Sequence, residues 1–200
     1  MKIAVLGWGS LIWNKGNLRL TTNWADGGPI LPIEFSRISD DGRLTLVIDE
    51  RHGADVPTRY AFSSLSDLDE AITNLQEREG TPFRNRIGFI DVARNHTCDR
   101  ARAKHPVACE RIRAWAADQE FGAVVWTAIG PRFKEKIGVP FSVDGAVRYL
   151  ASLQEPTRTL ALDYMRKAPA DVVTPVRKKV AAVLDPSAIP TGAAATECGG

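Results

Sequence analysis

IAVLGWGSLIW, at residues 3–13, places an apolar run of strand length before two glycines that are one residue apart. A serine follows the second glycine, and the chain then becomes apolar again. We expect a first strand over Lys2–Leu6 that enters a loop over Gly7–Ile12. Such a loop binds a nucleotide, binds another small ligand, or turns the chain for structural reasons alone, with Trp8 and Trp13 in the core.

The nucleotide interpretation requires a third glycine and a helix that begins directly after the loop. In the dinucleotide-binding fingerprint Gly-x-Gly-x-x-Gly, the N–H groups at the start of that helix hold the pyrophosphate. Here Ile12 occupies the third glycine position, and residues 13–29 show no apolar stripe at helical spacing. Glu34 stands where a ribose-binding acid would follow, but the helix before it is missing. A nucleotide-dependent enzyme is therefore the weakest of the three interpretations.

The composition is that of one globular domain with a core of its own. Of the 200 residues, 44% are hydrophobic and 25% are charged. The net charge of +2 gives no electrostatic reason to expect a nucleic acid or an acidic membrane as partner. Three cysteines, Cys98, Cys109 and Cys198, are too few for a disulfide framework. No apolar run reaches membrane-spanning length, so we expect a cytoplasmic protein without a membrane partner, whose oligomeric state is left open.

The segment SLSDLDEAITNLQEREG, residues 64–80, predicts an amphipathic helix. Its leucine and isoleucine side chains recur at spacings of four and three residues, which places them on one face. Ser64 or Ser66 is the expected N-cap, and acidic residues follow in the first turn, where the helix dipole favours them. The final glycine ends the helix, and a proline two residues later prevents its return.

The other expected elements follow from apolar runs, alternation and turn residues. Expected strands cover Ile30–Ser39, Arg43–Ile48, Thr58–Ser63, Phe83–Val92 and Gly122–Ile129. Expected helices cover Val107–Glu120, Val143–Gln154, Thr157–Lys167 and Val172–Leu184. Strands dominate early and helices late, so we expect an α+β fold rather than a regular β-α-β array. We expect one domain over residues 1–184, with a helical extension from residue 142 onward, and a flexible tail over residues 185–200.

The loop sequence GWGSLIW, Gly7–Trp13, resembles the substrate loop of the γ-glutamylcyclotransferase-like superfamily. The ChaC-type branch of that superfamily, which acts on glutathione, carries the same loop with tyrosine in place of Trp8. A second similarity follows in the same order along the chain. The family has a strand and then a helix that ends in a catalytic glutamate followed by glycine, and here Glu79 precedes Gly80. The resemblance covers residues 1–130 and leaves the C-terminal helices unaligned.

This resemblance implies a small twisted mixed β-barrel with flanking helices, and an internal aminolysis. The α-amine of a γ-glutamyl compound attacks its own side-chain amide carbon, which releases 5-oxoproline and a free amine. No metal or organic cofactor is needed, because the nucleophile belongs to the substrate. The resemblance gives Glu79 the role of general acid and base. The loop residues that it implies in holding the γ-glutamyl group are Gly7, Trp8, Gly9, Ser10 and Leu11.

The chemistry of these residue types supports the same roles. Backbone N–H groups of a glycine-containing turn stabilise an oxyanion, because the missing Cβ lets a substrate approach closely. We expect Gly9, Ser10 and Leu11 to supply such groups, with the Ser10 hydroxyl as an extra donor. Ser10 is not expected to be a nucleophile, because its flanks lack the Gly-x-Ser-x-Gly turn. Glu79 lies in the last helical turn, where backbone carbonyls raise the pKa of a carboxyl group.

Less specific roles stay open for two residues. Glu79 can instead be a solvated acid at a helix end, paired with Arg78 or Arg84. Glu77, two positions earlier, faces the other way, so the two glutamates do not enter one pocket. Arg37 lies near the position of an arginine-rich second strand in the ChaC-type branch. It either binds a substrate carboxylate through its guanidinium fork or faces outward from the strand.

The segment NHTCDRARAKHPVAC, residues 95–109, contains the histidines and cysteines that could suggest a zinc site. The gaps between them are one, six and three residues, unlike the close pairs typical of zinc sites, so we expect no metal. The basic run over residues 93–104 lacks interleaved aromatic residues. We expect it to be a solvated loop rather than a nucleic-acid site.

Two functions from different classes follow. The first is a cyclotransferase that converts a γ-glutamyl compound, such as glutathione or a γ-glutamyl amino acid or amine, to 5-oxoproline. The second is a small-molecule-binding module on the same fold without turnover, since a fold does not fix a function. The sequence does not identify the leaving amine. A position of Glu79 in a cavity at the Gly9–Ser10 turn favours the enzyme.

Overall fold

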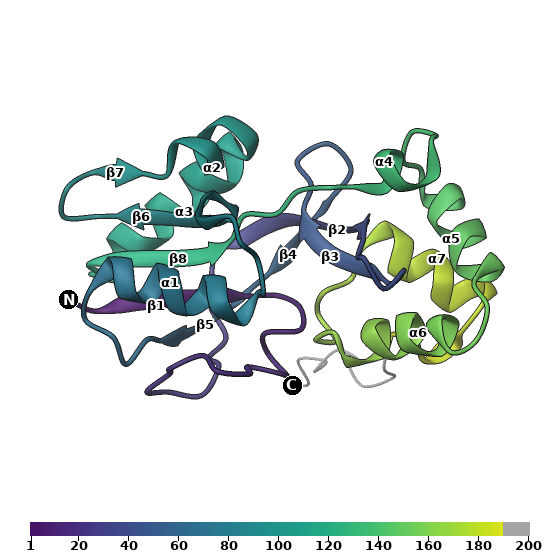
Figure 1. Ribbon diagram of the computed structural model, residues 1–200, viewed down its shortest axis with the longest axis horizontal. Helices are drawn as coiled ribbons and strands as arrows, with labels where there is room; N and C mark the ends of the chain where they lie inside the picture. Colours follow the sequence, from purple (N-terminus) through teal and green to yellow (C-terminus); the bar gives the residue numbers. More distant parts are fainter. Residues whose placement is uncertain (190–200) are drawn as a thin grey trace, which may run out of the picture.

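The computed structural model describes residues 1–189, and the strands in this part of the chain form two separate sheets (Figure 1). The larger sheet has the order β5–β1–β8–β6–β7, and the smaller one has the order β3–β2–β4. The strands are β1 (Ile3–Gly7), β2 (Ile30–Ile38), β3 (Leu44–Ile48), β4 (Ala54–Pro57), β5 (Arg59–Phe62), β6 (Ile87–Asp91), β7 (His96–Thr97) and β8 (Ala123–Thr127). The helices are α1 (Leu68–Arg78), α2 (Asp99–Lys104), α3 (Pro106–Asp118), α4 (Phe133–Ile137), α5 (Val143–Ser152), α6 (Thr157–Lys167) and α7 (Pro175–Val183). The expected α+β class is confirmed.

Strand β1 is buried along its whole length, because helices cover both faces of the larger sheet (Figure 1). It pairs antiparallel with β5 and parallel with β8. Ile3 and Val5 belong to one apolar cluster with α1, whereas Ala4 and Leu6 belong to another with α3. Side chains of a strand alternate between faces, so a strand covered on both sides is apolar throughout. This burial fixes the direction in which β1 delivers the loop that follows it.

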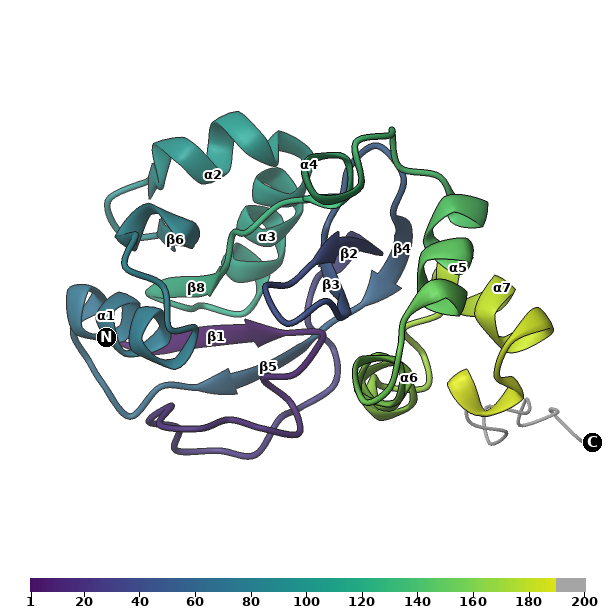
Figure 2. The ribbon, with the colours of Figure 1, turned by 45° about the vertical axis from the view of Figure 1, so that its right-hand side comes forward.

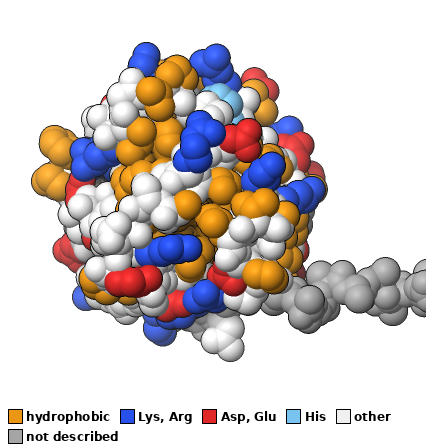
Figure 3. Space-filling view, turned by 90° about the vertical axis from the view of Figure 1, so that its right-hand side faces the viewer, with side chains coloured by type: hydrophobic (Ala, Val, Ile, Leu, Met, Phe, Trp, Pro, Cys, Tyr) orange, Lys and Arg blue, Asp and Glu red, His pale blue; other side chains and the backbone are white. Residues whose placement is uncertain are grey.

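The smaller sheet lies between the larger sheet and the C-terminal helices (Figure 2). Strand β2 contacts α3, α4 and α7, and β3 contacts α6. The face of the molecule on the side of the C-terminal helices carries apolar side chains interspersed with charged side chains of both signs (Figure 3). Within residues 1–189, the structure contains no helix with the length and apolar character needed to cross a membrane.

The two sheets do not close into the small twisted barrel that the resemblance implies. Closure requires hydrogen bonds around one continuous sheet. One edge strand of the larger sheet, β5, is instead covered by the irregular segment before β2, which bridges Leu20 to Ser63 and Ala25 to Tyr60. The other edge strand, β7, contains only two residues. One edge is thus occupied and the other is too short, so the smaller sheet stays separate.

The N-cap of α1 is Asp67 and not Ser64 or Ser66, as the sequence had suggested. The Asp67 carboxylate accepts a 3.0 Å hydrogen bond from the Glu70 N–H. An aspartate caps as well as a serine does, and its negative charge also interacts favourably with the helix N-terminus. The helix therefore begins at Leu68, later than the sequence predicted, and its C-terminal end, where Glu79 lies, is as expected.

Short helices, strands and turns account for the other differences between the expected and the observed secondary structure. The basic run over residues 93–104 contains β7 and α2 and is therefore not only a loop. The strand expected over Phe83–Val92 begins at Ile87, because Arg84–Arg86 form the 3-10 turn η1. Strand β4 and helix α4 were not expected. Elements of four or five residues are too short for hydrophobic periodicity to show.

The folded chain continues past residue 184, where the sequence predicted the start of a flexible tail. Asp185 caps the 3-10 turn η2 (Pro186–Ala188) by accepting a hydrogen bond from the Ser187 N–H. Ala188 is buried, and its carbonyl accepts a 2.6 Å hydrogen bond from Nε of the buried Arg177 in α7. The rest of the expected tail, residues 190–200, lies outside the described residues.

Glu34 joins β2 to α7 from a fully buried position. Its carboxylate oxygens accept hydrogen bonds from the N–H of Phe35 at 2.7 Å and the N–H of Val176 at 3.2 Å. Val176 lies in the first turn of α7, where N–H groups have no partner within the helix. Burial raises the pKa of Glu34 to about 7, although these hydrogen bonds act in the opposite direction. The attachment of α7 to β2 therefore depends on a group that titrates near neutral pH.

We expect the free energy of unfolding to fall as the pH rises from 5 to 8, and Glu34→Gln to flatten that slope. The folded protein keeps the proton of Glu34 to about pH 7, whereas the unfolded chain releases it near the ordinary value of 4.5. The resulting loss of free energy of unfolding approaches roughly 3 kcal/mol, since one pKa unit corresponds to about 1.4 kcal/mol. Urea denaturation at several pH values measures it, with the exposed Glu110→Gln as control. Parallel curves for wild type and Glu34→Gln would contradict this assignment.

Candidate functional site

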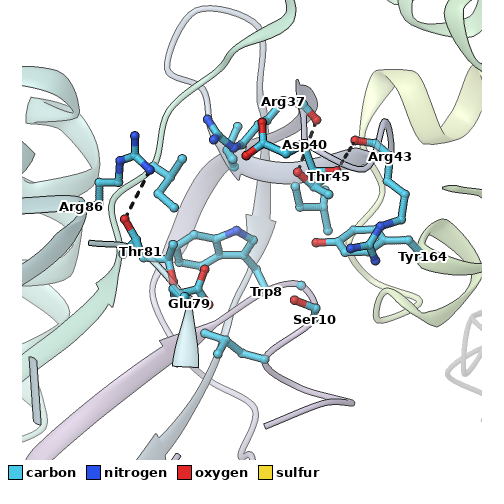
Figure 4. Close-up of a pocket in the computed structure, with 18 residues that line it drawn as sticks. Trp8, Ser10, Arg37, Asp40, Arg43, Thr45, Glu79, Thr81, Arg86 and Tyr164 are labelled. Carbon is cyan, nitrogen blue, oxygen red and sulfur yellow. Dashed lines mark hydrogen bonds between the residues drawn. The ribbon is translucent and has the colours of Figure 1, made fainter. Parts of the chain in front are cut away.

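A cavity of about 310 Å³ opens where the loop after β1, the end of α1 and the β2–β3 hairpin meet (Figure 4). Its volume is at the lower end of the range for small-ligand sites. The structure brings most of the residues that the sequence singled out into its wall. These are Trp8, Gly9, Ser10, Leu11, Arg37 and Glu79. Five separate stretches of sequence supply the wall, because Thr127 and Ile129 after β8 and Tyr164 from α6 also line it.

Gly7, which was expected to bind substrate, is not among the residues that line the cavity. It is the last residue of β1 and is buried. A Cβ at this position would lie 2.8 Å from the ring of Trp24. Gly7 is therefore needed for packing, because any larger residue would displace that indole ring. The sequence pattern alone does not distinguish a glycine that makes room for ligand from one that makes room for a side chain.

The loop from Gly9 to Asn14 forms a tight turn with unpaired donors at its start. The N–H of Ile12 donates to the Gly9 carbonyl at 3.0 Å, and the N–H of Asn14 donates to the Ser10 carbonyl at 2.8 Å. No acceptor within residues 1–189 pairs with the N–H groups of Gly9 and Leu11. Free N–H groups in such a turn can hold a carboxylate or an oxyanion.

Gly9 also gives Tyr164 room to enter the site. A Cβ on Gly9 would lie 2.7 Å from the Tyr164 hydroxyl oxygen, with the next nearest atoms at 3.8 Å. The Tyr164 ring packs edge-on against Trp13, with a centroid distance of 5.2 Å, and against Phe35 at 6.1 Å. Burial raises the pKa of Tyr164, so its hydroxyl stays protonated. The C-terminal extension thus contributes a hydroxyl group to the cavity wall.

The end of α1 sets the position of Glu79. Gly80 adopts a left-handed backbone with φ of 60°. Its N–H donates to the Glu77 carbonyl at 3.0 Å, and the N–H of Thr81 donates to the Gln76 carbonyl at 3.3 Å. This pair of hydrogen bonds is a Schellman motif, in which glycine at the left-handed position ends the helix. Glu79 is the C-cap residue of this motif, and its side chain therefore points from a fixed backbone into the cavity wall.

Glu79 is not the solvated helix-end acid of the simpler interpretation, although it does pair with Arg78. Its side chain is 15% exposed, and Nη1 of Arg78 donates to its Oε1 at 2.8 Å. Burial raises the pKa of Glu79, while the charges of Arg78 and Arg37 act in the opposite direction. A carboxylate with a raised pKa that is held beside a cavity can accept and return a proton near neutral pH.

Arg78 connects Glu79 to the loop after β1. Its Nη2 donates to the Asn14 carbonyl at 2.6 Å and to Oγ of Ser10 at 3.3 Å. The sequence suggested Arg78 only as an ion-pair partner of Glu79. Its second function, to hold the loop against the helix end, depends on a contact across 64 residues of chain that no local pattern encodes.

Tyr164 and Arg86 are among the cavity-lining residues that the sequence analysis did not single out. Tyr164 lies in α6 with Ala161 and Met165 on the buried face, so helical spacing could have marked it as an inward residue. Nothing local marks Arg86, because it belongs to the short turn η1. Arg37 lines the cavity and does not face outward from β2.

The histidines and cysteines of residues 95–109 do not form a site. Cys98, Cys109 and His105 are buried. Burial lowers the pKa of His105 to about 4, which keeps its imidazole neutral. Across residues 1–189, no three or more histidine, cysteine or acidic side chains are grouped so that they could hold a metal ion.

We expect Gly9→Ala to lower stability by about 1 to 3 kcal/mol, because its new methyl group overlaps the Tyr164 hydroxyl. The backbone itself is not strained at this position, since φ of Gly9 is not positive. Tyr164→Phe removes the overlapping oxygen, so the double variant should recover most of the loss. Denaturation of the four proteins in a double-mutant cycle measures the coupling. Additive effects would mean that Tyr164 does not approach Gly9.

We expect Arg78→Gln to raise the pKa of Glu79 further, because it removes the adjacent positive charge. A ¹³C NMR titration of the glutamate carboxyl carbons measures this value, with the signal assigned by its absence in Glu79→Gln. The exposed Arg84, which pairs with Asp69, provides the control variant Arg84→Gln. A Glu79 titration that is the same in wild type and in Arg78→Gln would contradict the ion pair.

Comparison of this chain with models of known protein families, with curated proteins and with solved structures finds no match. The resemblance to the γ-glutamylcyclotransferase-like superfamily therefore rests on the two sequence motifs. The function must be argued from the geometry of the cavity and the chemistry of its side chains.

Proposed function

We propose that this chain is a cyclotransferase that converts a γ-glutamyl compound to 5-oxoproline and a free amine. One observation carries the proposal: the half-buried Glu79 lines the same cavity as Gly9 and Leu11, whose N–H groups have no acceptor within residues 1–189. The Glu79 carboxylate can transfer a proton, and the N–H groups can bind a carboxylate or stabilise an oxyanion. These are the two needs of an intramolecular aminolysis.

The reaction balances without a co-reactant. Glu79 takes a proton from the α-ammonium group of the substrate, and the freed amine nitrogen attacks the side-chain amide carbon. A carbon–nitrogen bond forms within the glutamyl group, and the amide oxygen becomes an oxyanion. When the oxyanion collapses, the bond to the leaving nitrogen breaks, and Glu79 returns the proton to that nitrogen. The ring nitrogen gives up its remaining extra proton to the released amine, which departs as an ammonium ion. The cavity contributes by holding the reacting amine and carbon close together.

The environment of Glu79 supports this proton transfer. Burial raises its pKa, so the carboxylate is a stronger base than one in water, and Arg78 limits the rise so that the ionised form persists. Oxyanion stabilisation comes from the turn at Gly9–Leu11, with the hydroxyl groups of Ser10 and Tyr164 in the same wall. The protein supplies no nucleophile in this reaction.

The proposal also includes membership in the γ-glutamylcyclotransferase-like superfamily, which the order of the two motifs supports. The open sheets depart from the barrel expected for that superfamily. The site, rather than the overall fold, therefore carries the argument.

A binding module without turnover is the second candidate, and the ion pair between Arg78 and Glu79 favours it. A carboxylate that donor groups hold in its ionised form is a weaker base than a free one in the same cavity. In that case the cavity would bind a γ-glutamyl compound, and Glu79 would bind its ammonium group without removing a proton.

Release of 5-oxoproline distinguishes these functions when wild type is compared with Glu79→Gln and Glu77→Gln. We expect wild type and Glu77→Gln to release it from glutathione or from a γ-glutamyl amino acid. Glu77 lies two residues from Glu79, is exposed and does not line the cavity, so it is a matched control. Glu79→Gln should lower kcat by at least about 100-fold, the usual contribution of a general acid or base.

No release by wild type from any member of the panel, together with measurable binding, would favour the binding module. Turnover by Glu79→Gln at the rate of wild type would show that another group transfers the proton.

A further inference from the structure

A second cavity, of about 400 Å³, is lined by the loop after β3 and by the segment that contains α4. Its wall shares no residue with the wall of the cavity at Glu79. Neither the sequence motifs nor the proposed reaction gives this second cavity a role. Its volume lies within the range of small-ligand sites, so we ask which ligand its side chains would accept.

One part of this wall holds an imidazole in a fixed orientation. Asp49 is buried, and its Oδ1 accepts hydrogen bonds from the N–H groups of Arg51 and His52, both at 3.1 Å. Nδ1 of His52 lies 3.3 Å from each oxygen of the same carboxylate. A carboxylate only accepts hydrogen bonds, so Nδ1 carries the proton, and Nε2 of the neutral ring is an acceptor. No group of residues 1–189 donates to this Nε2 atom.

Aromatic and proline side chains form the apolar part of the wall. The ring of Phe141 packs against His52 with a centroid distance of 5.0 Å, and against Phe133 at 5.5 Å. Phe133 is buried and Phe141 is half-buried, so this cluster is anchored in the core and open on one side. Pro131 and Pro140 add further apolar surface. A flat aromatic ring would extend the cluster through the same edge-on contacts.

The charges of the wall restrict the polar group that such a ring can carry. Three cationic and two acidic side chains line the cavity: Arg51, Arg132, Lys134, Asp49 and Glu135. Arg51 and Lys134 form no ion pair with an acid of residues 1–189. The excess of positive charge disfavours an ammonium group as the donor to His52. It favours a hydroxyl group, whose oxygen becomes more negative as its proton is drawn toward Nε2.

We infer that this second cavity binds a phenol, an aromatic ring that carries a hydroxyl group. The hydroxyl donates to Nε2 of His52, and the ring packs against Phe133 and Phe141. Asp49 fixes the tautomer that makes Nε2 an acceptor. This site does not depend on the proposed function, since the two cavities have separate walls.

The test compares 4-fluorophenol with 4-fluoroanisole, in which a methyl group replaces the hydroxyl proton. A ¹⁹F NMR titration at about pH 8, where an ordinary imidazole is neutral, measures both affinities. We expect wild type to bind 4-fluorophenol about fivefold more tightly or better, as one hydrogen bond provides. His52→Phe keeps a ring beside Phe141 and removes the acceptor, so it should abolish this difference. His96→Phe is the matched control, because His96 is exposed and its ring also packs against a phenylalanine, Phe89, at 5.4 Å.

A measurement on wild type locates the ligand without depending on the folding of a variant. The chain has three histidines, and saturating 4-fluorophenol should shift the imidazole NMR signals of His52 and leave those of His96 unchanged. Glu79→Gln should bind 4-fluorophenol as wild type does. Equal affinities for the two probes, unshifted His52 signals, or a loss of binding in Glu79→Gln would overturn the site. Tighter binding of 4-fluorobenzoate than of 4-fluorophenol would also overturn it, because the cationic side chains and not the Nε2 acceptor would then select the ligand.

Discussion

The guanidinium group of Arg78 connects the parts of the molecule on which the site depends. It donates to Glu79 at the end of α1, and also to Asn14 and Ser10 in the loop after β1. Strand β1 and helix α1 pack against each other in one apolar cluster, so their ends are already close. Arg78 converts that proximity into a fixed distance between a carboxylate and a turn with free N–H groups. It also limits the rise of the pKa of Glu79 that burial causes.

The cavity wall carries charges of both signs. Glu79 provides the negative charge, and Arg37 and Arg86, which form no ion pair with an acid of residues 1–189, provide positive charges. The C-terminal helices contribute beyond stability, because α6 places Tyr164 against Gly9 in the same wall. The buried Glu34 attaches α7 to β2, whose hairpin with β3 carries Arg37. Fold stability and the shape of the site therefore share the same contacts.

The sequence predicted the elements whose burial leaves a clear pattern. Strand β1 is apolar at every position because it is covered on both faces, and α1 shows one apolar stripe because it covers one face. The prediction of a closed barrel was wrong. Closure depends on contacts at the sheet edges, such as that of Leu20 with Ser63, which no local sequence pattern encodes. In the site, Glu79 was predictable from the glycine that follows it. The missed residue Arg86 reaches the cavity only through a three-residue turn. Gly7 lies beside Trp24 and outside the cavity lining, which the sequence pattern does not indicate.

The central claim, that Glu79 faces the reacting amine of a γ-glutamyl group, is tested most directly by a crystal structure of Glu79→Gln with γ-glutamylalanine bound. The account predicts that the α-amine nitrogen lies within hydrogen-bond distance of the side chain at position 79, with the side-chain amide oxygen at the N–H groups of Gly9 and Leu11. A ligand bound in this cavity with its amine directed away from position 79, or bound elsewhere on the protein, would contradict it.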